Sequence, residues 1–396
     1  MKKTNRRNFI RTSVAGAAGA VAITPSLQAL VPGGDSQKII TRKLGKTELE
    51  VPVISFGVMR ADNPALCKAA HDRGIRLFDT ANGYQNGNNE AMLGKLFTGI
   101  PRESFILETK VKCAGVGRDG KPSSETTAED FLSKFKTSLS RLNMDYVDIL
   151  FIHDISNPEM LEYKPILAAV DRLKKEKKAR FIGFSTHNNM ANVIGAASGD
   201  PRWDVILTAY NFKQNNIDEM NAAIRKAAQA GIGIVAMKTL AGGFLDKEKT
   251  KPVNATAAMK WALSNTDVTT AIPGMTTFDH LEENVKVMSD LTITDQEKKD
   301  LIASVSSQGM YCSGCNSCSG QCPSQLPVPE LMRAYMYAYG YSNPKMAYSL
   351  LGELGTGSFP CINCEKCTVE CRSNFSVREK ITDVSRLVNI PSDFIV

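Results

Sequence analysis

The chain has 396 residues, a length that corresponds to two or three domains of ordinary size. Hydrophobic residues make up 43% and charged residues 22%, which is globular composition and excludes a disordered or fibrous chain. Lys and Arg exceed Asp and Glu by 48 − 41 = 7, but five basic residues and no acidic one lie in the first eleven positions. The remainder is almost neutral, so we expect no nucleic acid partner.

The amino-terminal segment has the layout of a secretory signal. Residues 1–11 read MKKTNRRNFIR, and residues 12–34 carry no charge and are rich in Gly and Ala. This apolar stretch is too weak and too short for a stable membrane span of about 20 residues.

The pair Arg6 and Arg7, followed by Asn-Phe-Ile, resembles the twin-arginine signal, whose export machinery carries proteins already folded around their cofactors. The resemblance implies that residues 1–34 are a signal peptide and linker, with cleavage after Ala29, and that the protein is periplasmic or otherwise extracytoplasmic. It is membrane-associated if the segment is retained. An ordinary secretory signal or an uncleaved anchor is the alternative.

From residue 53 onward, apolar and β-branched runs alternate with amphipathic segments of helical period. Eight such strands and their helices over some 240 residues have the period and size of a (β/α)8 TIM barrel, which we place at residues 38–300. A doubly wound sheet is disfavoured because no G-x-G-x-x-G follows the first strand. A hairpin lid is expected at 40–54. The eight predicted strands are 53–59, 76–81, 105–111, 147–154, 179–185, 205–211, 233–238 and 269–275.

Four polar residues stand at or just after the ends of predicted strands: Asp79, Tyr84, Lys110 and His153. Active sites of such barrels lie where the strands end, so we expect these side chains to share one mouth. Any one of them alone would more often be a cap or a structural residue. Together they suit carbonyl reduction, in which a proton donor must meet the negative charge that develops on oxygen.

In this arrangement Tyr84 is the acid/base. Lys110 is expected to lower the pKa of Tyr84 by stabilising the phenolate, and Asp79 to hold Lys110 charged and aimed. His153 can donate to the same substrate oxygen and orient it.

The run FDTANGYQNGNNEAMLG, with Lys110 in LETKV and His153 in DILFIHD, resembles the aldo-keto reductase superfamily over residues 40–290. The resemblance places that family's catalytic tetrad on Asp79, Tyr84, Lys110 and His153 and implies an enzyme that interconverts a small carbonyl and an alcohol. The loop 114–129 after the third strand could line its pocket.

The same resemblance implies a nicotinamide cofactor, NAD(P). Ser185 matches the residue that holds the carboxamide, but Leu207 stands where the family has a Gln. Glu283 and Asn284 match the residues that grip adenine. Gly274 and His280 replace the basic residues that pair with a 2′-phosphate, so a preference for NADP is doubtful. Alternatively, residues 270–290 only close the barrel.

Eight of the ten cysteines lie in the last quarter of the chain and form two runs of C-x2-C-x2-C-x3-C, the first followed by Pro323. In such runs three thiolates wrap one cubane and the fourth reaches the other cluster. We therefore assign two [4Fe-4S] clusters. Zinc, which prefers separated C-x2-C pairs, and disulfides are the alternatives. The predicted ligand sets are Cys312, Cys315, Cys318 and Cys371, and Cys361, Cys364, Cys367 and Cys322.

Residues 305–380 resemble a two-cluster ferredoxin, with a helical connection of 38 residues between Cys322 and Cys361. We expect a small, mainly helical ferredoxin-like domain there, and a tail at 381–396.

The combination predicts an exported iron-sulfur oxidoreductase of aldo-keto reductase type. Two clusters could pass an electron pair between the barrel and a redox partner protein or a quinol-linked carrier. Two alternatives remain open. The barrel could be fed by the clusters without a nicotinamide, or it could be a non-catalytic binding module with structural clusters.

Overall fold

The computed structural model describes residues 38–246, 248–306, 310–357, 360–361 and 364–395. The predicted signal segment, 1–34, lies outside these residues. From Ile39 onward the chain forms one compact unit, and the predicted boundary between barrel and cluster domain stays a prediction. No helix in the described ranges is both long and apolar enough to cross a bilayer.

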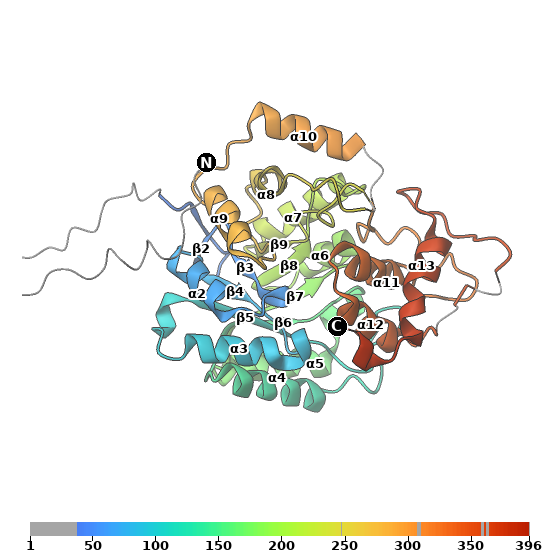
Figure 1. The fold of residues 1–396 in the computed structure, drawn as a ribbon. Coiled ribbons are helices and arrows are strands. Elements are labelled where there is room, and N and C mark those ends of the chain that lie inside the picture. The colour runs from blue at the N-terminus through green and yellow to red at the C-terminus, as the bar shows by residue number, and fades with distance from the viewer. Residues whose placement is uncertain (1–37, 247, 307–309, 358–359, 362–363, 396) are drawn as a thin grey trace, which may run out of the picture. The chain divides into compact units, whose positions relative to one another are not determined.

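The eight predicted strands form one parallel sheet in sequence order, β3 to β10 (Figure 1). Two parallel bridges, Ile54 to Ala271 and Gly57 to Gly274, join its edges, so the sheet is a nearly closed (β/α)8 barrel. A Cβ at Gly57 would lie 2.8 Å from the Ile272 carbonyl oxygen, which explains the glycine at this seam. The strands are β3 (Phe56–Gly57), β4 (Leu77–Asp79), β5 (Ile106–Val111), β6 (Val147–Ile152), β7 (Ala179–Thr186), β8 (Val205–Ala209), β9 (Gly233–Met237) and β10 (Thr270–Ala271).

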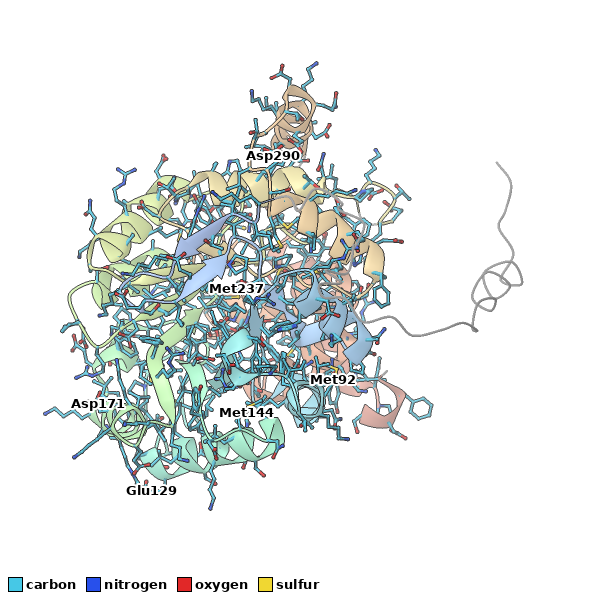
Figure 2. All side chains as sticks on the ribbon, turned by 90° about the vertical axis from the view of Figure 1, so that its left-hand side faces the viewer. Met92, Glu129, Met144, Asp171, Met237 and Asp290 are labelled. Atoms are coloured by element: carbon cyan, nitrogen blue, oxygen red, sulfur yellow. The ribbon has the colours of Figure 1, made fainter. Side chains whose placement is uncertain are left out.

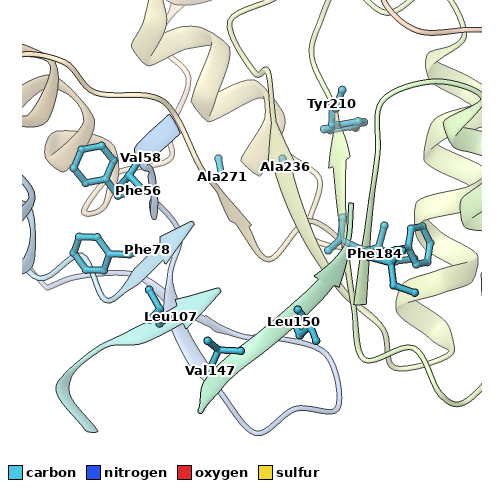
Figure 3. Packing of buried hydrophobic residues seen from close by; sticks show 14 of the residues in the cluster. Phe56, Val58, Phe78, Leu107, Val147, Leu150, Phe184, Tyr210, Ala236 and Ala271 are labelled. Atoms are coloured by element: carbon cyan, nitrogen blue, oxygen red, sulfur yellow. The ribbon is translucent and has the colours of Figure 1, made fainter. Parts of the chain in front are cut away.

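Amphipathic helices surround the barrel. Their apolar faces pack on the outward side chains of the strands, among them Phe56, Phe78 and Phe184 (Figure 3). Figure 2 shows Met237, the last residue of β9, near the centre of the view and Glu129 and Asp171 of the outer helices at its edge. The helices are α2 (Pro64–Asp72), α3 (Asn88–Phe97), α4 (Ala128–Leu142), α5 (Lys164–Lys175), α6 (Met190–Ala197), α7 (Ile217–Gln229), α8 (Ala255–Ser264) and α9 (Phe278–Val287).

The predicted hairpin at 40–54 is present as β1 (Thr41–Lys43) and β2 (Glu50–Pro52). It covers the amino-terminal end of the barrel, because the Lys46 amide donates to the Gly231 oxygen at 2.7 Å, beside the first residue of β9. The hairpin therefore plugs the barrel floor and leaves the opposite end for the site.

The C-terminal part is mainly helical, as predicted, and has its own core, which includes Leu331, Met332, Leu351 and Ile381. Figure 1 shows α11, α12 and α13 together at one side of the barrel. The amide of Asn189, which follows β7, donates to the Gly314 oxygen at 3.2 Å, so this part is seated on the barrel mouth. The elements are α10 (Asp295–Ser306), α11 (Val328–Tyr335), a π-helical turn η5 (Met336–Gly340), α12 (Pro344–Leu354) and α13 (Val377–Ser385).

Candidate active site

The four polar residues predicted at the strand ends lie together at the carboxyl end of the barrel. Asp79 ends β4, Lys110 lies in β5, His153 follows β6, and Tyr84 comes from the loop after β4. Lys110 Nζ lies 2.5 Å from Asp79 Oδ1 and donates a hydrogen bond of 3.3 Å to Tyr84 Oη. The rings of Tyr84 and His153 meet edge to face with centroids 6.0 Å apart. The structure thus brings all four into one site.

A tight turn holds the loop that carries Tyr84. Asn86 has a φ of 54°, in the left-handed region that Asn tolerates better than most residues. Gly87 has a φ of 89°, and a Cβ there would lie 2.2 Å from the guanidinium carbon of Arg141. Arg141 in turn donates to the Asn82 oxygen at 2.8 Å. Because position 87 is glycine, Arg141 of α4 can pack against the loop and hold it in place.

The pKa of Tyr84 is raised above its ordinary value, chiefly because burial disfavours the phenolate. Lys110 acts in the opposite direction, as expected, while Asp79 and Glu108 add to the rise. The predicted effect of Lys110 is therefore present, but the net pKa of Tyr84 is raised because desolvation outweighs the ammonium. Tyr84 is a neutral phenol at physiological pH, the form that can donate a proton.

The imidazole of His153 is also neutral at physiological pH. Burial lowers its pKa to about 3, and the cations of Lys110 and Arg333 act in the same direction, against the opposing effect of Asp154. A neutral imidazole can donate one hydrogen bond to a substrate oxygen without carrying charge into the site.

Glu108 is a fifth titratable side chain at the site, and the strand-end pattern does not single it out. It lies two residues before Lys110 in β5, is fully buried, and pairs in register with Asp79 of β4. Side chains two apart on a strand share a face, so Glu108 and Lys110 both point into the barrel. That spacing, with an acid inside an apolar strand, is the signal that could have found it.

Arg333 of α11 reaches the barrel mouth from the C-terminal part. Its Nη2 atom lies 2.7 Å from Asp154 Oδ2, and the two side chains are 7% and 10% exposed. Asp154 directly follows His153 and has a φ of 69°, and its amide donates to Ser185 Oγ at 2.9 Å. Glu330, one turn earlier on α11, pairs with Arg333 and accepts a hydrogen bond from the Asn188 side chain. A side chain of the cluster domain thus supports the loop next to His153.

A cavity of about 260 Å³ lies where the C-terminal part meets the barrel. His187 and Lys238 line it from the barrel, and Tyr311 and Cys312 line it from the other side. The ring centroids of His187 and His153 are 6.2 Å apart, so one lining residue of this cavity lies beside the tetrad. None of its described lining residues belongs to the 114–129 loop; in that loop Arg118 instead donates to the Gly355 oxygen.

The residues predicted to hold a nucleotide lie on two elements, β7 and α9. Ser185 is buried near the end of β7 and accepts the Asp154 amide. Leu207, at the position expected for a Gln, is packed in the apolar barrel interior. On α9, Glu283 accepts a hydrogen bond from Thr256 at 3.3 Å, and Asn284 is buried. Their nucleotide contacts stay a prediction.

Gly274 and His280 are both exposed beside these α9 residues. The His280 ring accepts a hydrogen bond of 3.4 Å from the Thr276 amide. Neither position supplies a permanent cation, in keeping with the sequence-based doubt about a 2′-phosphate.

All eight clustered cysteines are free thiols, so a disulfide framework is not formed. Burial raises the pKa of Cys312 to about 12, and the thiols that add to this rise are Cys318, Cys315 and Cys371. For Cys361, burial again comes first, followed by Cys364, Cys322 and Cys367. The neighbours of Cys312 are the other members of its predicted ligand set, and the same holds for Cys361. In each case the set includes the fourth cysteine of the other run.

The second set encloses a hollow. Cys322, Cys361, Cys364 and Cys367 line one cavity together with apolar side chains such as Val328 and Ile381. Among the described residues, no group of three or more His, Cys, Asp or Glu converges closely enough to hold a metal ion directly. Zinc requires four ligands about 2.3 Å from one point, whereas a cubane takes one thiolate at each of its four irons. The two runs of C-x2-C-x2-C-x3-C, in place of separated C-x2-C pairs, are what favours clusters over zinc.

The chain belongs to the aldo/keto reductase family, whose model matches residues 56–256, and it is therefore an oxidoreductase. Residues 311–376 match the 4Fe-4S dicluster domain, which supports iron-sulfur clusters in the C-terminal part.

Curated relatives match the barrel. L-galactose dehydrogenase of Arabidopsis thaliana is 27% identical over 67% of this chain and 92% of that protein. Methylglyoxal reductase DkgB of Escherichia coli O157:H7 is 27% identical over 64% and 93%, respectively. The solved structure of an aldo-keto reductase from Pseudomonas aeruginosa is 26% identical, with a TM-score of 0.52 over 63% of this chain and 94% of that one. All three are similar to the barrel of this chain.

Proposed function

We propose that this protein is an exported oxidoreductase that interconverts a small carbonyl compound and its alcohol, with Tyr84 as acid/base and two [4Fe-4S] clusters as an electron relay. The observation that carries the proposal is the position of Lys110, whose ammonium contacts both the Asp79 carboxylate at 2.5 Å and the Tyr84 hydroxyl at 3.3 Å. Relatives named as a methylglyoxal reductase and a sugar dehydrogenase support a small oxygenated substrate.

In the reducing direction, two electrons and one proton reach the carbonyl carbon as hydride, and negative charge develops on oxygen. Tyr84 donates its hydroxyl proton to that oxygen, and the ammonium of Lys110 stabilises the phenolate that remains. Neutral His153 donates a hydrogen bond to the same oxygen and orients it. In the oxidising direction the phenolate takes the proton back from the alcohol.

A bound nicotinamide would supply or accept the hydride. Ser185 is available to its carboxamide, because the serine oxygen accepts the Asp154 amide while its hydroxyl hydrogen can still be donated. Glu283 and Asn284 would hold adenine. Leu207 offers no amide, and Gly274 and His280 offer no permanent cation, so the residues present favour NAD over NADP and fit a nicotinamide only in part.

When bound, the clusters supply one-electron transfer. Cys312 lines the cavity at the barrel mouth, whereas the cavity of the Cys361 set is lined only by residues of the C-terminal part. We therefore propose that the Cys312 set is the inner site and the Cys361 set the outer one, which would face a redox partner protein or a quinol-linked carrier.

The twin-arginine segment supports export to the periplasm or another extracytoplasmic compartment, since that route accepts proteins folded around their cofactors. Replacing both Arg6 and Arg7 with Lys in the full chain, followed by cell fractionation, tests it. Retention of the variant in the cytoplasm is expected, and unchanged export would exclude this route.

The test of the catalytic proposal uses purified protein with reconstituted clusters under anaerobic conditions. NADH and NADPH are titrated by fluorescence, and a panel of small aldehydes, ketones and sugars is then analysed for alcohol products. Binding of NADH with turnover of a carbonyl supports the proposal.

Two other outcomes point to other functions. Turnover with an artificial one-electron donor but no binding of either nucleotide would favour a barrel that receives its electrons from the clusters. The absence of an amide side chain at position 207, which is Leu, supports this second function. Binding of a carbonyl compound without any turnover would favour a non-catalytic module.

A further inference from the structure

The barrel interior holds two acids and one base directly below Tyr84. Asp79, Glu108 and Lys110 are 2%, 0% and 1% exposed, so water screens none of their charges. The other interior side chains around them are apolar, among them Leu77 and Ile149.

Lys110 does not pair equally with Asp79 and Glu108. Its Nζ atom lies 2.5 Å from Asp79, and its remaining hydrogen bonds go to the Thr80 oxygen at 2.8 Å and to Tyr84 at 3.3 Å. Neither carboxyl oxygen of Glu108 has a hydrogen-bond donor among the described residues. An ionised carboxylate without a donor is unfavourable in an apolar interior.

Asp79 and Glu108 are also direct neighbours. They are partners in the register of β4 and β5, and the charge of Asp79 acts on Glu108. Two neighbouring buried carboxyl groups hold one proton between them, because two like charges in an apolar interior disfavour each other. Asp79 has the ammonium as counterion, so the proton belongs on Glu108.

We propose that Glu108 is a positioning residue of the active site, held as a neutral carboxyl that donates to Asp79 and thereby leaves the ammonium of Lys110 directed at Tyr84. An ionised Glu108 would compete for Lys110 and would oppose formation of the phenolate, since its charge acts on Tyr84 as well. The inference rests on the proposed role of Tyr84, but the neutral state of Glu108 can be measured without any substrate.

Infrared spectroscopy of the full-length holoprotein tests the proposal, because a protonated carboxyl has a carbonyl stretch that a carboxylate lacks. We expect such a band at pH 7, shifted by 13C-labelled glutamate but not by 13C-labelled aspartate, and lost in Glu108→Gln. The matched control is Asp148→Asn, which removes a buried acid paired with Arg102 and Arg180 at the same distance, 2.6 Å. The control should keep the band.

The variant Asp79→Asn separates positioning from simple packing. Without its charged neighbour, Glu108 becomes the only acid for Lys110, so its band should disappear at a lower pH than in the native protein. A pure packing role predicts no such shift. If Glu108→Gln fails to fold, the labelled native protein still decides: absence of a glutamate band at pH 7 overturns the proposal. That result would leave carbonyl turnover, measured separately, unaffected.

Discussion

The guanidinium of Arg333 lies 2.7 Å from the carboxylate of Asp154, although 179 positions separate the two residues. Arg333 belongs to the cluster domain, and Asp154 follows His153 at the barrel mouth. Burial opposes ionisation of Asp154, but Arg333, together with smaller effects of other neighbours such as Lys112, holds the pKa of Asp154 below its ordinary value. The ion pair joins the two halves of the chain at the point where the proposed chemistry takes place.

Arg333→Met should destabilise the protein by about 3 kcal/mol, because it removes the nearest partner of the largely buried Asp154 charge and leaves only Lys112 at 3.8 Å. Guanidinium-induced unfolding measures the change. Arg118→Met, which removes an exposed contact between the same two parts, should change stability by less than about 0.5 kcal/mol. Equal effects of the two variants would contradict the importance assigned to the buried pair.

Tyr84→Phe should lower kcat by about 10²–10⁴-fold for any carbonyl substrate found, since positioned proton transfer contributes that much. The fold should persist, because the phenyl ring fills the same space. Tyr163→Phe, which removes only a contact with the Ser123 oxygen at 3.0 Å on the outer surface, is the matched control. Native turnover in Tyr84→Phe would refute its role as acid/base.

Acidification should destabilise the protein in part through His153. Its pKa is lowered from 6.5 to about 3 by burial, so the unfolded chain takes up a proton first as the pH falls. The neutral His153 therefore contributes fully to the free energy of unfolding above pH 6.5. This contribution is lost progressively between pH 6.5 and 3, with about 2 kcal/mol lost by pH 5.

The pH dependence of unfolding should therefore be weaker in His153→Gln than in the native protein. Histidine NMR gives a direct check, because the chain has only four histidines. A His153 resonance that titrates near pH 6.5 would contradict the lowered pKa.

Replacing the fourth cysteine of each run tests the exchange of ligands between clusters. Cys371→Ser should damage the cluster of Cys312, Cys315 and Cys318, and Cys322→Ser the other one. Iron content should fall toward half in each variant, and electron paramagnetic resonance should show which cluster remains. If each substitution affects the cluster of its own run, the exchanged assignment is wrong.

Lys238→Met should lower the reduction potential of the inner cluster. Lys238 shares the mouth cavity with Cys312 and interacts with it electrostatically. Burial lowers the pKa of Lys238 to about 7, so we expect the effect below pH 7, where the variant loses a positive charge that favours the added electron. Lys366→Met, beside the outer thiols but exposed to solvent, should shift its cluster less because water screens the charge. Potentiometric titration followed by electron paramagnetic resonance measures the reduction potential of each cluster separately. A shift confined to the outer cluster in Lys238→Met would reverse the proposed assignment of the inner and outer clusters.

Much of the fold was predictable because it depends on patterns in neighbouring residues of the sequence. The alternation of apolar strands with amphipathic helices predicts the eight β/α units, and residues at the ends of adjacent parallel strands must meet, which brings Asp79, Lys110 and His153 together. The C-x2-C-x2-C-x3-C spacing predicts the two thiol sets in the same way, since short loops determine which sulfurs are neighbours.

Burial and long-range contacts decided the rest. The net rise in the pKa of Tyr84 depends on the loss of solvent around the folded site, a quantity that strand-end residues alone do not reveal. The register of β4 and β5 makes Glu108 a neighbour of Asp79, and the docking of α11 on the barrel makes Arg333 a partner of Asp154. Neither contact can be predicted from the local sequence. The amino-acid sequence therefore determined which groups are present and their local spacing, whereas tertiary packing determined their solvation and partners, because both depend on residues far apart in the chain.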